Sequence, residues 1–159
     1  MASNAEKALE LFKKRVGTTE GPGDWHRVDQ DQINLFADAT LDHQFIHVDV
    51  ERAKKGPFGA PIAHGFLTLS LLTHLQSTIK PADPGVYAGI AAGINYGFDK
   101  VRFVSPVKVD SRVRASRELM SVEAANANTL QVKQKVTVEI EGEGRPACVA
   151  EWITRLVYA

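Results

Sequence analysis

The chain is poor in cysteine and has no excess charge of either sign. One cysteine, Cys148, occurs among 159 residues, so no disulfide can form within the chain, and a reducing compartment suits it. Nineteen Lys plus Arg balance nineteen Asp plus Glu, giving a formal net charge of zero. A general nucleic-acid binder carries a basic excess, so we expect no nucleic-acid partner.

Long hydrophobic runs are also missing. No segment approaches the ~20 apolar residues that a membrane-spanning helix needs. The N-terminal segment MASNAEKALELFKKRVG has no apolar core followed by a cleavage-like site, as a secretory signal would. We therefore expect a cytoplasmic protein that does not insert into a membrane.

Three widespread enzyme motifs do not occur in the sequence. There is no GxSxG elbow of serine hydrolases, no GxGxxG loop of dinucleotide-binding proteins and no HExxH frame of zinc enzymes. His43 and His47 have helical i, i+4 spacing, and His64 and His74 follow, but no cysteine joins them. We expect neither a metal ion nor a separate cofactor.

The length predicts one domain spanning residues 1–159. Apolar spacing and capping residues indicate helices over 5–16, 29–39 and 50–55, with Asp29 as an N-cap and a short strand at 25–28. Residues 62–79 are apolar around most of the helical circumference, which is typical of a buried helix. The segment 80–99, rich in proline and glycine, is expected as a surface connection or a mobile wall.

The C-terminal half reads as strands, at 101–109, 112–122, 130–141 and 148–158. Within 130–141 apolar residues and Gln134 alternate with charged and polar ones, which is the period of a strand with one buried face. Together these patterns predict an α+β fold with a long central helix wrapped by a curved antiparallel sheet. Because long strands leave an open edge that must be covered, we expect a homodimer.

The strongest candidates for catalytic residues are Asp42, His47 and Gly65. A carboxylate and an imidazole five residues apart can act together in proton transfer. Asp42 as a turn cap, with His47 bonded to a local carbonyl, is the structural alternative. Gly65 opens the buried helix, where a free backbone N–H can stabilise an oxyanion. Tight helix–sheet packing is the alternative reason for that glycine.

Three stretches carry a resemblance to a known family. They are TLDHQFIHVD at 40–49, IAHGFLTLSL at 62–71 and INYGFDKVRFVSPV at 94–107. Over residues 29–115 the chain resembles the MaoC-like, or (R)-specific enoyl-CoA hydratase, family with its hot-dog fold, and within it the NodN-like branch. The family pattern has Asn-Pro where this chain has Gln44-Phe45, and Gly where it has Leu41.

The resemblance implies a hydro-lyase that reversibly adds water to a trans-2-enoyl-CoA to give the (R)-3-hydroxyacyl-CoA. Asp42 and His47 would hold the water, and the Gly65 N–H would polarise the thioester carbonyl of the acyl-CoA. The resemblance also implies substrate-binding residues, namely His64, Thr73, Asn95, Gly97 and Arg102. Candidate cations for the CoA phosphates are Lys54, Lys55, Lys100 and Arg102.

Two other functions remain open at this point. A hot-dog acyl-CoA thioesterase also needs a carboxylate and an oxyanion donor, but it would hydrolyse the thioester. A non-catalytic acyl-CoA-binding protein of the NodN-like branch is suggested by the loss of Asn-Pro at residues 44–45.

Overall fold

The computed structural model describes all 159 residues, and its main element is an antiparallel sheet in the order β1-β4-β5-β6-β3, with β2 also paired to β4. The consecutive strands β4, β5 and β6 are neighbours in the sheet and form an antiparallel meander. The strands are β1 (Thr19–Glu20), β2 (His26–Arg27), β3 (Ile90–Phe103), β4 (Arg112–Asn126), β5 (Thr129–Ile140) and β6 (Cys148–Tyr158).

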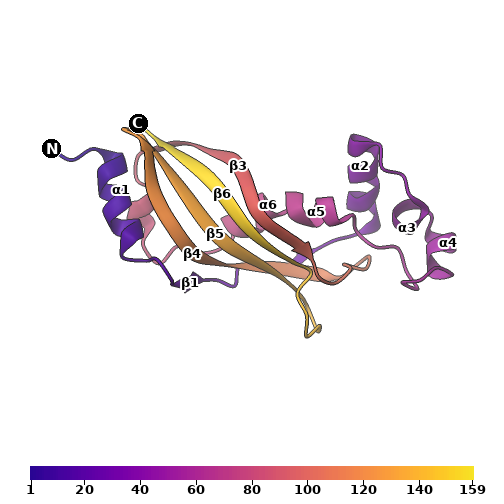
Figure 1. Cartoon of the computed structure of the whole chain (residues 1–159). Helices are drawn as coiled ribbons and strands as arrows, with labels where there is room; N and C mark the ends of the chain where they lie inside the picture. The colour runs from indigo at the N-terminus through magenta and orange to yellow at the C-terminus, as the bar shows by residue number, and fades with distance from the viewer.

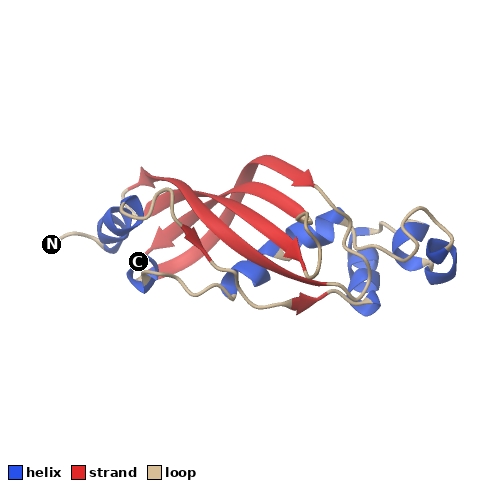
Figure 2. Cartoon of the chain, turned by 90° about the horizontal axis from the view of Figure 1, so that it is seen from below, coloured by secondary structure: helices blue, strands red, loops and turns tan.

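The helices divide into three groups around this sheet. They are α1 (Asn4–Lys13), α2 (Gln30–Thr40), α3 (Phe45–Val48), α4 (Val50–Lys54), α5 (Gly65–Ser70), α6 (Leu72–Ser77) and the 3-10 helix η1 (Pro84–Tyr87). Helices α5 and α6 run along one face of the sheet, while α2, α3 and α4 lie beyond one end of it and α1 lies at the other (Figures 1 and 2). The α+β class is confirmed. No helix combines the length and the apolar composition needed to cross a bilayer.

The expected single helix over 62–79 is wrong in detail. The chain becomes helical only at Gly65, and Leu71 separates α5 from α6. Residues 62–64 are extended because their backbone is used elsewhere: Ile62 bridges to Lys108, and the Ala63 N–H donates to the Val107 carbonyl at 2.7 Å. The helix therefore begins at the glycine rather than before it.

The segment 80–99 is not a plain connection either. Strand β3 starts at Ile90 and pairs along its length with β6, ending at Phe103, short of the expected 101–109 strand. None of its fourteen residues is buried. A strand without a buried face has no reason to alternate apolar and polar residues, so the periodicity that reveals strands is missing.

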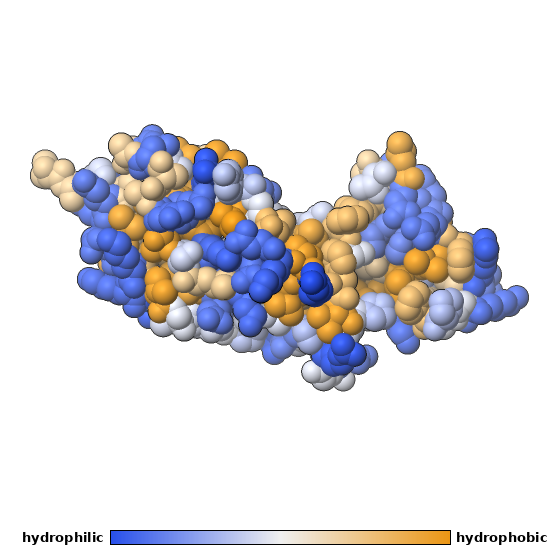
Figure 3. Space-filling model, in the orientation of Figure 1, coloured by the Kyte–Doolittle hydropathy of each residue, from blue (hydrophilic) through white to orange (hydrophobic).

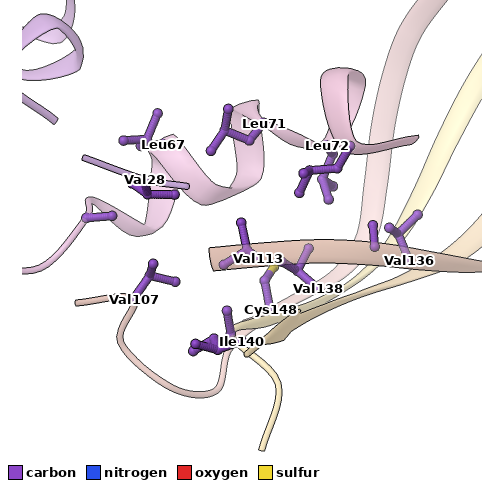
Figure 4. Packing of buried hydrophobic residues seen from close by; sticks show 14 of the residues in the cluster. Val28, Leu67, Leu71, Leu72, Val107, Val113, Val136, Val138, Ile140 and Cys148 are labelled. Carbon is purple, nitrogen blue, oxygen red and sulfur yellow. The ribbon is translucent and has the colours of Figure 1, made fainter. Parts of the chain in front are cut away.

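The core fills the space between the helices and the sheet in two clusters. One, of 17 residues, joins α5 and α6 to the ends of β4, β5 and β6 nearest α2, and Figure 4 labels ten of its members. The other, of 9 residues, packs α1 on the opposite end of the sheet. Cys148 is fully buried in the first cluster, and burial raises the pKa of its thiol to about 11, so it is an inert core residue, as expected.

Candidate active site

The position of Asp42 is set by helix α2, which begins at a capped first turn and ends just before Asp42. Asp29 caps the first turn, its carboxylate accepting from the Gln32 N–H at 2.9 Å, as the sequence predicts. At the other end Leu41 adopts a left-handed conformation with φ 63°, which ends the helix and turns the chain. The next residue is Asp42, half-buried, and its side chain lies where α2 passes into α3.

His47 is fixed in a single orientation on the one-turn helix α3. Its side chain is 6% exposed, and its Nδ1 lies 2.7 Å from the Ile62 carbonyl oxygen. Because a carbonyl can only accept, Nδ1 carries the proton and Nε2 presents a free lone pair. Burial lowers the pKa of His47 below its ordinary value, against the opposing effect of the Ile62 hydrogen bond. His47 is therefore a neutral imidazole ready to accept a proton.

His64 completes the arrangement, and the sequence assigned it only to substrate binding. Its ring is 2% exposed and stacks on His47 with centroids 3.8 Å apart and an interplanar angle of 24°. Its Nε2–H donates to the Asp42 carbonyl at 2.9 Å. Its Nδ1 is buried and has no hydrogen-bond partner. His64 thus links the backbone of one half of the pair to the ring of the other.

Asp42, His47 and His64 each offer one ligand atom within 4.8 Å of the others. A metal ion shared by both imidazoles would lie about 2.0–2.1 Å from each nitrogen and in the plane of each ring. Rings stacked 3.8 Å apart and nearly parallel keep their lone pairs in separate planes. The geometry therefore favours proton transfer over metal binding, and the other histidines lie elsewhere: His43 pairs with Asp38, and His74 contacts His26.

Gly65 follows His64 directly and is the first residue of α5. Its N–H donates to no acceptor within the chain, as expected at a helix start. A Cβ at this position would come within 3.1–3.2 Å of the Phe103 ring, so the glycine also permits this close contact. Both readings of Gly65, a free N–H and tight packing, hold. A mainly apolar cavity of about 290 Å³, lined by Gly65, Phe103 and Thr68 among others, adjoins it.

The remaining expected substrate residues separate into two groups. Thr73 and Asn95 line a second cavity, of about 410 Å³, between α6 and strands β3 and β6. The Thr73 hydroxyl donates to the Ser70 carbonyl at 3.3 Å and not to Asp42 or His47. Gly97 and Arg102 line neither cavity, and the Arg102 guanidinium donates to the Val101 carbonyl at 2.9 Å.

The candidate cations for a phosphate group do not form one cluster. Lys54 pairs with Glu51 at 3.0 Å on the same helix, and Lys100 lies 4.0 Å from Glu151. Lys55 and Arg102 are exposed and form no ion pair. Lys55 lies near the end of the α2–α4 lobe, whereas Arg102 is on β3, so the two candidates without a carboxylate partner are far apart in the sequence and on different elements.

The departures from the family pattern leave the loop ordered. Phe45 packs its ring under the Arg52 guanidinium, 3.9 Å from the ring centroid, and the Gln30 amide donates to the His47 carbonyl at 2.8 Å. The Gln44 N–H approaches the Asp42 carboxylate at 3.4 Å. These contacts tie α3 to α4 and α2.

In Figure 3 a notch bordered by hydrophobic residues separates the sheet from the α2–α4 lobe.

Several contacts that build the site left no signal in the sequence. Gln30 and the Ile62 carbonyl hold His47 from both sides, and Phe36 tilts against His64 at 5.0 Å. A polar residue in the first turn of a helix or a carbonyl in an apolar segment is too common to point to a role. The adjacency of His64 to the glycine was visible, but its stacking on a residue seventeen positions earlier was not.

A curved sheet that cradles a short helix, with a half-buried carboxylate and a buried imidazole near the start of that helix, is the architecture of a hot-dog protein. Residues 11–141 match the MaoC like domain, and the chain belongs to this family. It is 52% identical over 142 residues, 89% of this chain and 91% of the relative, to 3-hydroxyacyl-thioester dehydratase Z of Mycobacterium tuberculosis.

Two further relatives support the assignment. Nodulation protein N of Rhizobium leguminosarum bv. viciae is 49% identical over 150 residues, covering 94% of this chain and 91% of that protein. The solved structure of the R-hydratase PhaJ1 from Pseudomonas aeruginosa, in its unliganded form, superposes with a TM-score of 0.67 over 91% of this chain and 83% of its own, at 22% identity. At that identity the likeness shows the fold alone. The expected resemblance to the MaoC-like family, its NodN-like branch included, is confirmed.

Proposed function

We propose that this protein is an (R)-specific enoyl-CoA hydratase, which adds water reversibly to a trans-2-enoyl-CoA to give the (R)-3-hydroxyacyl-CoA. The neutral His47 with its free Nε2 beside Asp42 is the observation that carries this proposal. The high identity to a protein named as a 3-hydroxyacyl-thioester dehydratase supports a thioester substrate and this reaction class.

In this mechanism the Gly65 N–H polarises the thioester carbonyl. The free N–H can donate to an oxygen that gains negative charge as the enolate forms. An oxyanion donor of this kind contributes about 3–4 kcal/mol to the transition state in other enzymes. The Phe103 ring packs against Gly65 and bounds one side of this position.

The proton balance follows from the state of His47. A water molecule held between Asp42 and His47 loses a proton to the pair as its oxygen bonds to C3 of the enoyl group. C2 must gain one proton to complete the addition. Because neutral His47 and a carboxylate hold no spare proton, the proton taken from the water is the one delivered to C2. In the dehydration direction the same pair removes the C2 proton and returns it to the leaving hydroxyl.

An assay with crotonyl-CoA tests this function. A hydratase removes the enoyl absorbance without releasing thiol, whereas a hot-dog thioesterase releases free CoA thiol. A non-catalytic acyl-CoA-binding protein does neither but still binds the ligand. Loss of enoyl absorbance without thiol release supports the proposal, and either other result overturns it.

We also propose that the protein is a homodimer joined through β3. This strand is the outermost of the sheet, pairs on one side only, and exposes several large hydrophobic side chains. They are Ile90, Ile94, Tyr96, Phe98 and Phe103. An exposed, long, apolar edge strand is a template for pairing with another chain. A second copy with the same edge would cover it and extend the sheet.

A further inference from the structure

The face of the sheet that packs on α5 and α6 carries one polar side chain on each of its three central strands. These side chains are Arg117 on β4, Gln134 on β5 and Thr154 on β6. In each strand the residue two positions to one side belongs to the larger apolar cluster, and the residue two positions to the other side to the smaller one. A polar row therefore divides the core. Together with Gln76 of α6, which faces it, we call these residues the polar belt.

Most of the polar belt is satisfied internally. Arg117 is 4% exposed and donates from Nε and Nη2 to the Glu20 carboxylate at 2.9 and 2.7 Å. The Gln76 amide donates to the Gln134 side-chain oxygen at 2.9 Å. The one charge of the belt is thus neutralised by a carboxylate, and Gln76 is held in place by a buried partner.

Two atoms at the belt have no partner. They are the Gln76 Oε1 and the indole Nε1–H of Trp152, a residue that is 5% exposed. Exchanging the side-chain oxygen and nitrogen of both Gln76 and Gln134 would not change this. The hydrogen bond between the two amides uses only one polar atom of Gln76, so the other stays unpaired. Both residues line the cavity of about 410 Å³ that also contains Thr73, Asn95 and Thr154. Buried polar atoms without partners cost stability, so their retention at a cavity wall points to a ligand.

We propose that this cavity receives the acyl chain of the substrate and selects chains that carry a neutral hydroxyl group beyond the reacting carbons. A hydroxyl can accept a hydrogen bond from the Trp152 Nε1–H and donate one to the Gln76 Oε1. An unsubstituted alkyl chain would leave both atoms unpaired and desolvated. This inference rests on the proposed function, because it takes the thioester at Gly65 as the fixed end of the substrate.

The charge balance argues for a neutral group rather than a carboxylate or an amine. Arg117 is already neutralised by Glu20, so an ionised ligand group would enter the cavity without a counter-charge. An unpaired buried charge is far more costly than an unpaired neutral group. The polar belt therefore favours a hydroxyl over both charged alternatives.

The test compares matched trans-2-enoyl-CoA substrates over a series of chain lengths. At each length one member ends in a methyl group, one in a hydroxyl and one in a carboxylate. At the length that reaches the belt, we expect the hydroxyl member to have a kcat/KM at least ~10-fold above that of the methyl member, because a site built to hydrogen-bond a hydroxyl rejects analogues that lack it. The carboxylate member should be the poorest.

Variants locate the effect. Gln76→Leu should reverse the preference towards the methyl member. The double variant Gln76→Leu/Gln134→Leu serves if the single one fails to fold, since it leaves neither amide unpaired. The matched control is Gln131→Leu. It makes the same Gln-to-Leu change as at Gln134, also on β5, but on the opposite face of the sheet, where Gln131 contacts Glu123 and Arg155. It should leave the preference of the wild-type protein unchanged.

The outcomes separate this inference from the proposed function. A preference for the methyl member at every length, unchanged by Gln76→Leu, overturns the inference and means that water satisfies the belt. A preference for the carboxylate member overturns the choice of a neutral group. If no enoyl-CoA is hydrated at all, the proposed function fails, and calorimetric binding of saturated acyl-CoA with and without a terminal hydroxyl decides the role of the belt by itself.

Discussion

The rings of His47 and His64 lie 3.8 Å apart and nearly parallel, and both are almost fully buried. Each imidazole has one nitrogen bonded to a backbone carbonyl, His47 to Ile62 and His64 to Asp42. These two contacts join α3 and the loop before it to residues 62–64, which lead into α5. The stack therefore holds Asp42 and His47 next to His64, the residue before Gly65, although they come from a different part of the chain.

This relationship gives His64 a positioning role that substitution can test. His64→Phe keeps an aromatic ring, somewhat larger than the imidazole, but loses the hydrogen bond to the Asp42 carbonyl, which is worth about 1 kcal/mol. We expect kcat/KM for enoyl-CoA hydration to fall roughly 5- to 10-fold with only a small change in Tm. His64→Ala also removes the buried ring and should lower Tm strongly. Full activity in His64→Phe would show that the carbonyl contact is not needed.

The pH dependence should reflect the lowered pKa of His47. In the folded protein His47 binds fewer protons than in the unfolded chain, where its pKa is near 6.5. The free energy of unfolding should therefore rise with pH below about 6.5, and this contribution is lost as the pH falls towards the lower folded pKa. The acid limb of kcat/KM should likewise have its midpoint below 6.5, as a pH–rate profile can measure. A midpoint above 6.5 would contradict a neutral, buried His47.

A pair of variants separates two properties of Gly65, its free N–H and its lack of a side chain. Gly65→Ala keeps the N–H but places a Cβ against the Phe103 ring. Gly65→Pro also places side-chain atoms against the Phe103 ring, and in addition it removes the N–H. Proline suits this first helical position, and His64 has a compatible ψ of 137°. We expect Gly65→Pro to hydrate crotonyl-CoA at least ~100-fold more slowly than Gly65→Ala, which matches the cost of removing an oxyanion donor.

The control for that comparison is Gly65→Ala combined with Phe103→Ala. Removing the ring relieves the contact at 3.1–3.2 Å, so the double variant should recover activity relative to Gly65→Ala. Equal activities of the alanine and proline variants would mean that the Gly65 N–H contributes nothing to catalysis.

The proposed dimer has a direct test in solution. Light scattering after size-exclusion chromatography should give twice the chain mass of 17.4 kDa. Ile94→Lys places a charge on the exposed face of β3 and should shift the protein to the monomer. Val16→Lys, the same kind of change at an exposed residue just after α1, should leave the dimer intact. A wild-type monomer at micromolar concentration would contradict the proposal.

The sequence predicted those elements whose signal is local. The alternation in β5 and the Asp29 cap of α2 depend on neighbours in the chain, and both were found where expected. Gln134 was already visible as a polar residue on the apolar face of its strand. The sequence also showed the spacing of Asp42 and His47, and the family motifs added the roles expected of them.

The sequence did not predict features set by distant contacts. Residues 62 and 63 are extended because they pair with residues 107 and 108, and β3 forms because β6 offers a partner. The stack of His47 on His64 depends on how the α2–α4 lobe folds back over the start of α5. The division of the core by the polar belt required the register of three strands, which no local pattern fixes.

The most direct test of the account is the rate of crotonyl-CoA hydration in Asp42→Asn and His47→Gln beside the wild-type protein. Asp42→Asn is nearly isosteric, His47→Gln keeps a polar side chain of similar length, and far-UV circular dichroism can confirm that the fold is retained. If the pair transfers the proton, each variant should lose ~100-fold or more of kcat, a typical share for acid–base catalysis. If either variant hydrates crotonyl-CoA at close to the wild-type rate, Asp42 and His47 are not the proton-transfer pair.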